Sequence, residues 1–198
     1  MLRSWLVLAI FFGLSGPTPA FQSKDKPAPS SASQASVITI HAQKSGLFSG
    51  FAHNHLISAP IAKGTVNGQR MAAEIVVAVK DMKVVDPEVS DKDRAEIQST
   101  MLGPKVLDAA RYPEIRFVSS RIEPSGGQRF RVTGTLQLHG ASRELSFDVT
   151  GGPDHYQGKT KLKQTDFGIQ PVSVAGGTVK VKDELELDFD VYPASLPQ

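Results

Sequence analysis

The chain has 198 residues, of which 40% are hydrophobic and 21% are charged, and it contains no cysteine. The lack of cysteine excludes a disulfide scaffold, a zinc–thiolate site and a cysteine enzyme. Lys and Arg number 22 and Asp and Glu number 20, so the net charge is +2, too small to indicate a nucleic acid as the main partner. This length is typical of one globular domain whose core needs neither a metal nor a disulfide.

The first twenty residues are typical of a secretory signal peptide. Arg3 gives a short basic region, residues 5–14 form an apolar run, and the small residues Thr18 and Ala20 end the segment. Ten apolar residues are too few to span a bilayer comfortably, so a retained anchor is the weaker alternative. We expect cleavage after Ala20 and a periplasmic or secreted product. Residues 21–36 are rich in Lys, Pro, Ser and Ala and are expected to form a disordered leader.

From Val37 onward, apolar and polar residues alternate with the period of two that predicts β-strands. The expected strands are residues 37–41, 46–57, 61–67, 71–84, 115–123, 129–138, 144–150, 156–165 and 178–191. A hairpin turning at Gly140 connects two of them. Asp183 falls among the apolar positions of the last run, which predicts a β-bulge there or a carboxylate facing the interior.

One interval breaks the β pattern and predicts a helical insertion. Ser90 followed by Asp93 resembles a capping box, and Gly103–Pro104 ends the helix. A second short helix is expected to run through Leu107. The fold class is therefore all-β with one short helical insertion.

Long antiparallel strands with one apolar face have three usual arrangements: a sandwich, a barrel filled by its own side chains, or a barrel around a ligand cavity. A barrel of about eight such strands is wide enough for a small or elongated apolar ligand. The pattern alone leaves a sandwich core equally open.

Three segments resemble one known family. They are Asp108–Phe117 (DAARYPEIRF), Phe130–Leu145 (FRVTGTLQLHGASREL) and Thr165–Ile169 (TDFGI), and they resemble the YceI-like family of bacterial exported proteins. The resemblance covers most of residues 37–191. It implies a lipocalin-like, extended antiparallel β-barrel that accommodates a long polyisoprenoid chain, and it implies no conserved catalytic chemistry.

On this resemblance, the YceI-like domain is expected at residues 37–192, followed by a tail at 193–198. The expected function is that of an exported carrier or a sequestering, stress-related protein. Its expected partner is a long-chain isoprenoid or another amphiphilic lipid, without a cofactor, a nucleic acid or a stable membrane span. A homodimer is left open, and so is a stress-related interaction module whose core is filled.

Strand parity assigns apolar side chains to the lumen, and two helix residues are expected to close one end. The expected ligand-binding residues are Ile75, Val77, Val79, Met101, Leu102, Phe117, Phe130, Val132, Leu136, Leu138, Leu145, Phe147, Leu185, Leu187 and Phe189.

The alternative function is that of a metal-dependent enzyme or metal-binding protein using His53 and His55. Residues i and i+2 of a strand share a face, so both imidazoles could reach one ion. A third ligand would have to come from another strand, with His41 or His139 as candidates. A polar cluster at the barrel mouth explains the same residues. No Gly-x-Ser-x-Gly elbow and no phosphate-binding loop are present, so no catalytic residue is assigned.

Overall fold

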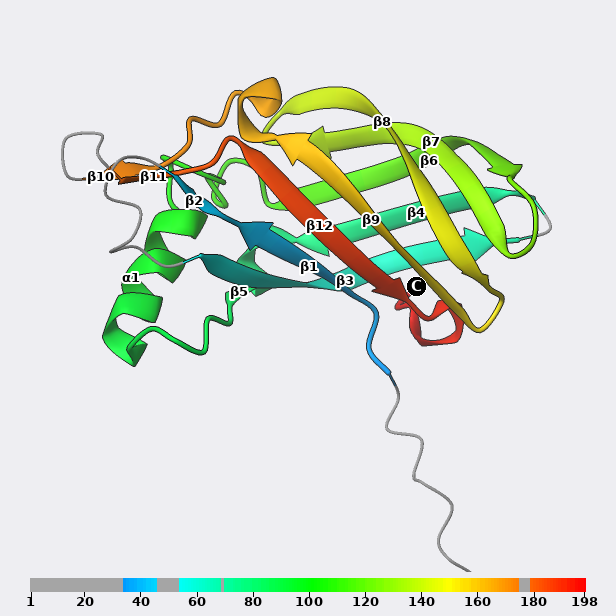
Figure 1. Ribbon diagram of the computed structural model, residues 1–198, viewed down its shortest axis with the longest axis horizontal. Coiled ribbons are helices and arrows are strands. Elements are labelled where there is room, and N and C mark those ends of the chain that lie inside the picture. The colour runs from blue at the N-terminus through cyan, green and yellow to red at the C-terminus, as the bar shows by residue number, and fades with distance from the viewer. Residues whose placement is uncertain (1–33, 46–53, 69, 175–178) are drawn as a thin grey trace, which may run out of the picture. The chain divides into compact units, whose positions relative to one another are not determined.

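The structure is a computed structural model that describes residues 34–45, 54–68, 70–174 and 179–198. Its long strands are β1 (Val37–Ala42), β3 (His55–Asn67), β4 (Ala72–Ala78), β6 (Glu114–Pro124), β7 (Arg129–Leu138), β8 (Ala141–Gly152), β9 (His155–Lys163) and β12 (Glu184–Val191). Within the described residues these eight strands pair antiparallel in the order β1-β12-β9-β8-β7-β6-β4-β3, and β1 pairs with β3 to close a barrel (Figure 1). The expected all-β barrel is confirmed, and the sandwich is excluded.

The shorter elements gather mainly at one end of the barrel. They are β2 (Lys44–Ser45), the 3-10 turn η2 (Val79–Asp81), β5 (Lys83–Val84), α1 (Asp91–Leu102), η3 (Gln164–Phe167), β10 (Ser173–Val174), β11 (Val179–Val181) and η5 (Pro193–Ser195). Strands β10, β11 and β2 form a small second sheet, and β5 pairs with β3. Figure 1 shows α1 and this small sheet at the same end of the barrel. We call this the α1 end, and the opposite end, where β3 turns into β4, the Arg70 end.

Alternation along β7 shows how the sequence builds the barrel wall. Val132, Leu136 and Leu138 are buried, whereas Thr135 and Gln137 between them are exposed. Because successive side chains of a strand point to opposite faces, the apolar set must face the lumen. The same period places the lysines of β9 on the outside.

The β7–β8 hairpin turns at His139 and Gly140, as expected. Both residues have positive φ, 51° and 77°, which is the backbone of a two-residue type I′ turn. A Cβ at Gly140 would lie 2.7 Å from a ring carbon of Tyr112, and the Tyr112 and His139 rings are 4.6 Å apart. The YP and LHG motifs therefore contact each other.

Two expected strands are interrupted. The run 71–84 ends as a strand at Ala78, turns through η2 and resumes only as β5. The run 178–191 stops at Val181 and resumes at Glu184. Asp183 lies in that gap, so both expectations for it are wrong: its carboxylate accepts bonds from Thr165 N (2.9 Å) and Thr165 Oγ1 (2.7 Å).

The remaining expected strands differ in their bounds. Residues 55–57 and 61–67, expected in two strands, belong to the single strand β3. Residues 46–53 lie outside the described part of the chain.

The helix is capped as expected. Ser90 Oγ accepts a bond from Asp93 N at 3.1 Å, and Gly103 follows the last helical residue. The expected second helix is wrong, because residues 104–107 form turns, in which Leu107 N donates to Met101 O.

The boundaries of the folded domain extend slightly beyond 37–192. Ser36 is buried and bonds to Tyr192, with Tyr192 N donating to Ser36 Oγ at 2.9 Å. Residues 193–198, expected as a tail, pack on the barrel: Leu196 is buried and Gly64 N donates to Pro197 O at 2.9 Å. These terminal residues are therefore part of the barrel's Arg70 half, where Leu196 packs with Ile61.

Candidate functional site

The barrel lumen contains two adjoining cavities. The larger, which we call the large chamber, has a volume of about 850 Å³, and the smaller, the small chamber, about 240 Å³. Ile38, Leu136 and Leu187 line both chambers, so one apolar wall runs through them. The lumen therefore contains two neighbouring, mainly apolar spaces that the side chains do not fill.

The large chamber lies at the α1 end and combines an aliphatic wall with polar groups. Ile97 and Met101 of α1 line it, together with Ile57 of β3 and Leu185 of β12. Its polar and charged lining residues are Lys44, His55, Asp93, Glu96, Thr100, Lys105, Gln164, Gln170, Ser173 and Lys180. Several of these are exposed, so the chamber reaches the protein surface at this end.

The small chamber lies at the Arg70 end and is dominated by aromatic rings. Phe147 lies between Phe117 and Phe189, with ring centroids 5.4 Å and 5.2 Å apart. Phe130 and Tyr156 meet edge to face at 6.1 Å. All five rings line the small chamber. Tilted and edge-to-face pairs of this kind contribute stability beyond the burial of their surface, so the ring contacts stabilise the wall of this chamber.

Two glycines make room for those rings. A Cβ at Gly134 would lie 2.5 Å from the Phe117 ring, and one at Gly158 would lie 2.4 Å from the Phe189 ring. Gly158 pairs directly with Phe189 across β9 and β12. Each ring therefore lies against a bare stretch of backbone instead of filling the lumen.

Most of the expected ligand-binding residues face one of the chambers. The large chamber is lined by Val77, Met101, Leu138 and Leu185, the small chamber by Ile75, Phe117, Phe130, Val132, Leu145, Phe147 and Phe189, and both by Leu136 and Leu187. Contact of these residues with a ligand stays a prediction.

Val79 and Leu102 line neither chamber. Val79 is 1% exposed and packs in the wall, because the chain leaves the strand and turns through η2 at this residue. Leu102 ends α1 and packs against the core cluster of the α1 end.

The lumen residues of β1, β3 and β9 were not predicted from the sequence. Ile38 and Ile40 of β1 and Ile57 of β3 line the large chamber, and the alternation in VITIHA was the signal for the first two. Thr160 and Leu162 of β9 also face the lumen. Their strand alternates lysine with mixed residues, so its inner face is only partly apolar.

The histidines bind separate partners. His41 Nε2 lies 3.2 Å from Asp188 Oδ2, His139 Nδ1 3.2 Å from Phe167 O, and His155 Nε2 3.0 Å from Asp190 Oδ1. His55 Nδ1 lies 2.7 Å from Asp86 Oδ2.

The metal alternative gains no support from these positions. His53 lies outside the described residues. In the described part of the chain, no three His, Asp or Glu side chains come together as a possible metal site.

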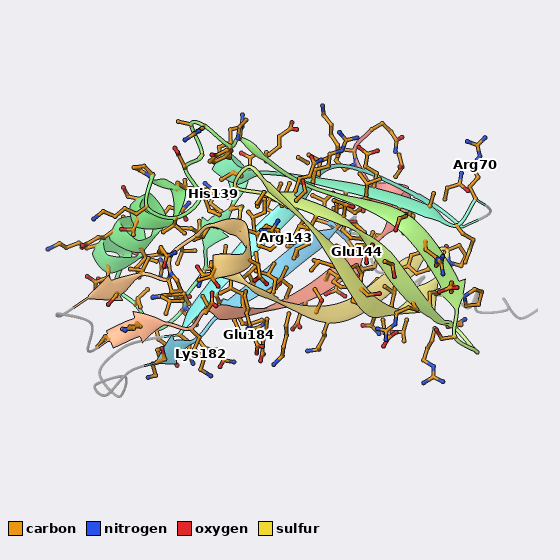
Figure 2. All side chains as sticks on the ribbon, turned by 90° about the horizontal axis from the view of Figure 1, so that it is seen from above. Arg70, His139, Arg143, Glu144, Lys182 and Glu184 are labelled. Atoms are coloured by element: carbon orange, nitrogen blue, oxygen red, sulfur yellow. The ribbon has the colours of Figure 1, made fainter. Side chains whose placement is uncertain are left out.

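Charged side chains lie on the outer face of the barrel (Figure 2). Between β9 and β12, Lys161 Nζ lies 2.9 Å from Glu184 Oε1 and 3.2 Å from Glu186 Oε1. The hydrogen bond to Glu184 is the main reason that the pKa of Lys161 is raised and that of Glu184 lowered.

Figure 2 shows Arg70 at one end of the barrel and His139 toward the end that carries α1. The described residues contain no helix long and apolar enough to cross a bilayer.

Comparison with known proteins agrees with this architecture. The sequence-family model of the YceI-like domain matches residues 28–192 of this chain. The chain belongs to the YceI-like family. A UPF0312 protein of Pseudomonas putida strain W619 is 31% identical over 109 residues, 50% of this chain and 54% of that protein. One of Vibrio parahaemolyticus is 30% identical over 115 residues, 53% of this chain and 59% of that protein. The matches thus span little more than half the length of these relatives.

The fold of this YceI-like chain also resembles that of a solved structure. The crystal structure of Burkholderia cenocepacia BcnA superposes with a TM-score of 0.57 at 19% identity, covering 78% of this chain and 94% of BcnA. At this identity the likeness concerns the fold, and it agrees with the barrel described above.

Proposed function

We propose that this YceI-like protein is a non-enzymatic binding protein that holds the apolar chain of an isoprenoid or another amphiphilic lipid in its lumen. The observation that carries the proposal is the unfilled apolar space of two adjoining chambers, about 850 Å³ and 240 Å³. Volumes of this order are typical of ligand pockets. The resemblance of the YP and LHG segments to a polyisoprenoid-binding family supports the ligand class.

The driving force for binding is the burial of apolar surface. Each Å² of apolar ligand surface removed from water contributes about 25 cal/mol, before the cost of ordering the ligand is subtracted. A flexible chain that occupies both chambers buries more surface than one that occupies the large chamber alone. Affinity should therefore rise with chain length until the small chamber is filled.

The N-terminal sequence supports an exported carrier. Residues 1–20 have the basic, apolar and small-residue regions of a signal peptide. An apolar chain needs such a container to move through an aqueous compartment. We therefore propose a location in the periplasm or outside the cell, and a role as a carrier or as a protein that sequesters lipid under stress.

Native mass spectrometry of the protein purified from its own host tests the proposal. The expected result is one amphiphile with a long apolar chain per protein chain, which denaturing extraction releases for identification. A protein that arrives empty, and that takes up no long-chain amphiphile when one is supplied, would overturn the proposal.

A further inference from the structure

A buried carboxylate, Asp86, is bound to a histidine in the wall of the large chamber. His55, the first residue of β3, lines this chamber, and its Nδ1 lies 2.7 Å from Oδ2 of Asp86. The Asp86 side chain is only 3% exposed, against 22% for His55. Burying a carboxylate beside an apolar cavity costs free energy unless it is well bonded. The buried pair therefore needs an explanation that packing alone does not give.

Asp86 is fixed from several sides. Its second carboxylate oxygen accepts a hydrogen bond from the Leu56 backbone N–H. The Arg94 side chain donates to the Asp86 carbonyl oxygen from Nη2 at 2.9 Å and from Nε at 3.2 Å. Because the carboxylate is held in place, it fixes the orientation of the His55 ring, as a carboxylate does for many functional histidines.

The carboxylate also determines which His55 nitrogen carries the proton. A carboxylate only accepts hydrogen bonds, so Nδ1 has to donate to it. In a neutral imidazole, Nε2 then offers a lone pair as an acceptor. No hydrogen bond joins Nε2 to another residue in the described part of the chain. His55 lines the chamber and Asp86 does not, and Nδ1 is bound to Asp86, so Nε2 is the ring nitrogen left for a ligand.

We propose that His55 Nε2 anchors the head group of the amphiphile by accepting a hydrogen bond from a hydroxyl group, with Asp86 as the positioning residue. This inference rests on the proposed function and deepens it. The preferred ligand is a long-chain alcohol, with its hydroxyl at the α1 end and its chain directed toward the small chamber. An ether of the same length has no proton to donate and leaves Nε2 without a partner.

The test compares the binding of hexadecanol, its methyl ether and hexadecanoate to the purified protein. The wild type is expected to bind the alcohol about fivefold more tightly than the ether, the typical net effect of one hydrogen bond. In Asp86→Asn the amide NH₂ can donate to Nδ1, which moves the ring proton to Nε2. Since Nε2 then donates to alcohol and ether alike, the preference should disappear.

The matched control is Asp190→Asn. The His155–Asp190 pair has the same chemistry, with Nε2 3.0 Å from Oδ1, but neither residue lines a chamber. This variant should keep the fivefold preference. If Asp86→Asn does not fold, His55→Phe keeps an aromatic ring of similar size without either nitrogen, and the alcohol and the ether should then bind equally.

Three outcomes would overturn the inference. The first is equal binding of alcohol and ether by the wild type, the second is tighter binding of hexadecanoate than of hexadecanol, and the third is an unchanged preference in a folded Asp86→Asn or His55→Phe variant. In each of these cases the apolar chain still binds and the proposed function stands. A wild-type protein that binds none of the three probes contradicts the proposed function itself.

Discussion

The two chambers of one lumen are built from different residues. At the α1 end, aliphatic side chains from the barrel and α1 are joined by polar groups, including the His55–Asp86 pair. At the Arg70 end, five aromatic rings line a space less than a third as large, and glycines hold two of those rings against the wall. The same alternating strands therefore build both a large chamber with polar groups and a small aromatic one.

The largest expected effect is that of a charge in the small chamber. Phe147→Asp places a carboxylate between Phe117 and Phe189, where no cation is available to pair with it among the residues that line the chamber. We expect a loss of more than about 4 kcal/mol in unfolding free energy, or no folded protein. Ser173→Asp, at an exposed position of the large chamber, should change the unfolding free energy by less than about 1 kcal/mol. Urea denaturation followed by circular dichroism measures both, and equal losses would contradict the contrast.

The next effect concerns the glycine beneath an aromatic ring. In Gly158→Ala the new Cβ would lie 2.4 Å from the Phe189 ring and 2.6 Å from the Asp148 carbonyl oxygen. Because the backbone contact cannot be relieved by a ring rotation, we expect a loss of about 2–3 kcal/mol. Gly152→Ala is the control, since nothing lies within 4 Å of its Cβ position. A Gly158→Ala variant as stable as Gly152→Ala would show that the ring does not depend on the glycine.

Filling each chamber with a larger side chain should affect different properties. Ile75→Trp in the small chamber should destabilise the fold by about 1–2 kcal/mol, because the larger side chain has to fit among the five aromatic rings that already line this space. Leu185→Trp in the large chamber should cost less than about 1 kcal/mol but should shorten the longest alkyl chain that the protein binds. Thermal unfolding and a chain-length series of alcohols separate the two outcomes. Equal destabilisation, or an unchanged length limit in Leu185→Trp, would contradict the assigned sizes.

The smallest effect is the acid sensitivity contributed by Asp183. Hydrogen bonds from the Thr165 side chain and backbone lower the pKa of this carboxyl below its ordinary value of 3.8. A lowered folded-state pKa contributes stability above the ordinary value, and that stability is lost as the pH falls through the lowered one. In Thr165→Val the side-chain donor is lost. The difference in unfolding free energy between the wild type and this variant should therefore be larger at pH 6 than at pH 2. A stability difference that does not change with pH would contradict this role.

The sequence predicts those features that neighbouring residues decide. The alternation in β7 and β12 reports which face is apolar, and the Ser90 cap and the Gly140 turn depend on local backbone geometry. Val79 was misplaced because parity cannot show where a chain leaves its strand to form η2.

The candidate site was harder to predict because it depends on distant segments. The division of the lumen into two chambers follows from the register of eight strands, which sets where Phe117, Phe147 and Phe189 meet. The His55–Asp86 pair joins residues 31 positions apart, and no pattern around Asp86 distinguishes it from an exposed carboxylate. Sequence alone named His55, but only as a metal candidate.

A long-chain alcohol with a nitroxide at its terminal carbon can report where the tail of a bound ligand lies. We expect the bound probe to broaden the NMR signals of Phe130, Phe147 and Tyr156 in the small chamber, with little effect on Ile97 and Met101 at the α1 end. Broadening concentrated at Ile97 and Met101, or none at all, would contradict a lumen that takes up the apolar chain from the α1 end and holds its tail among the aromatic rings.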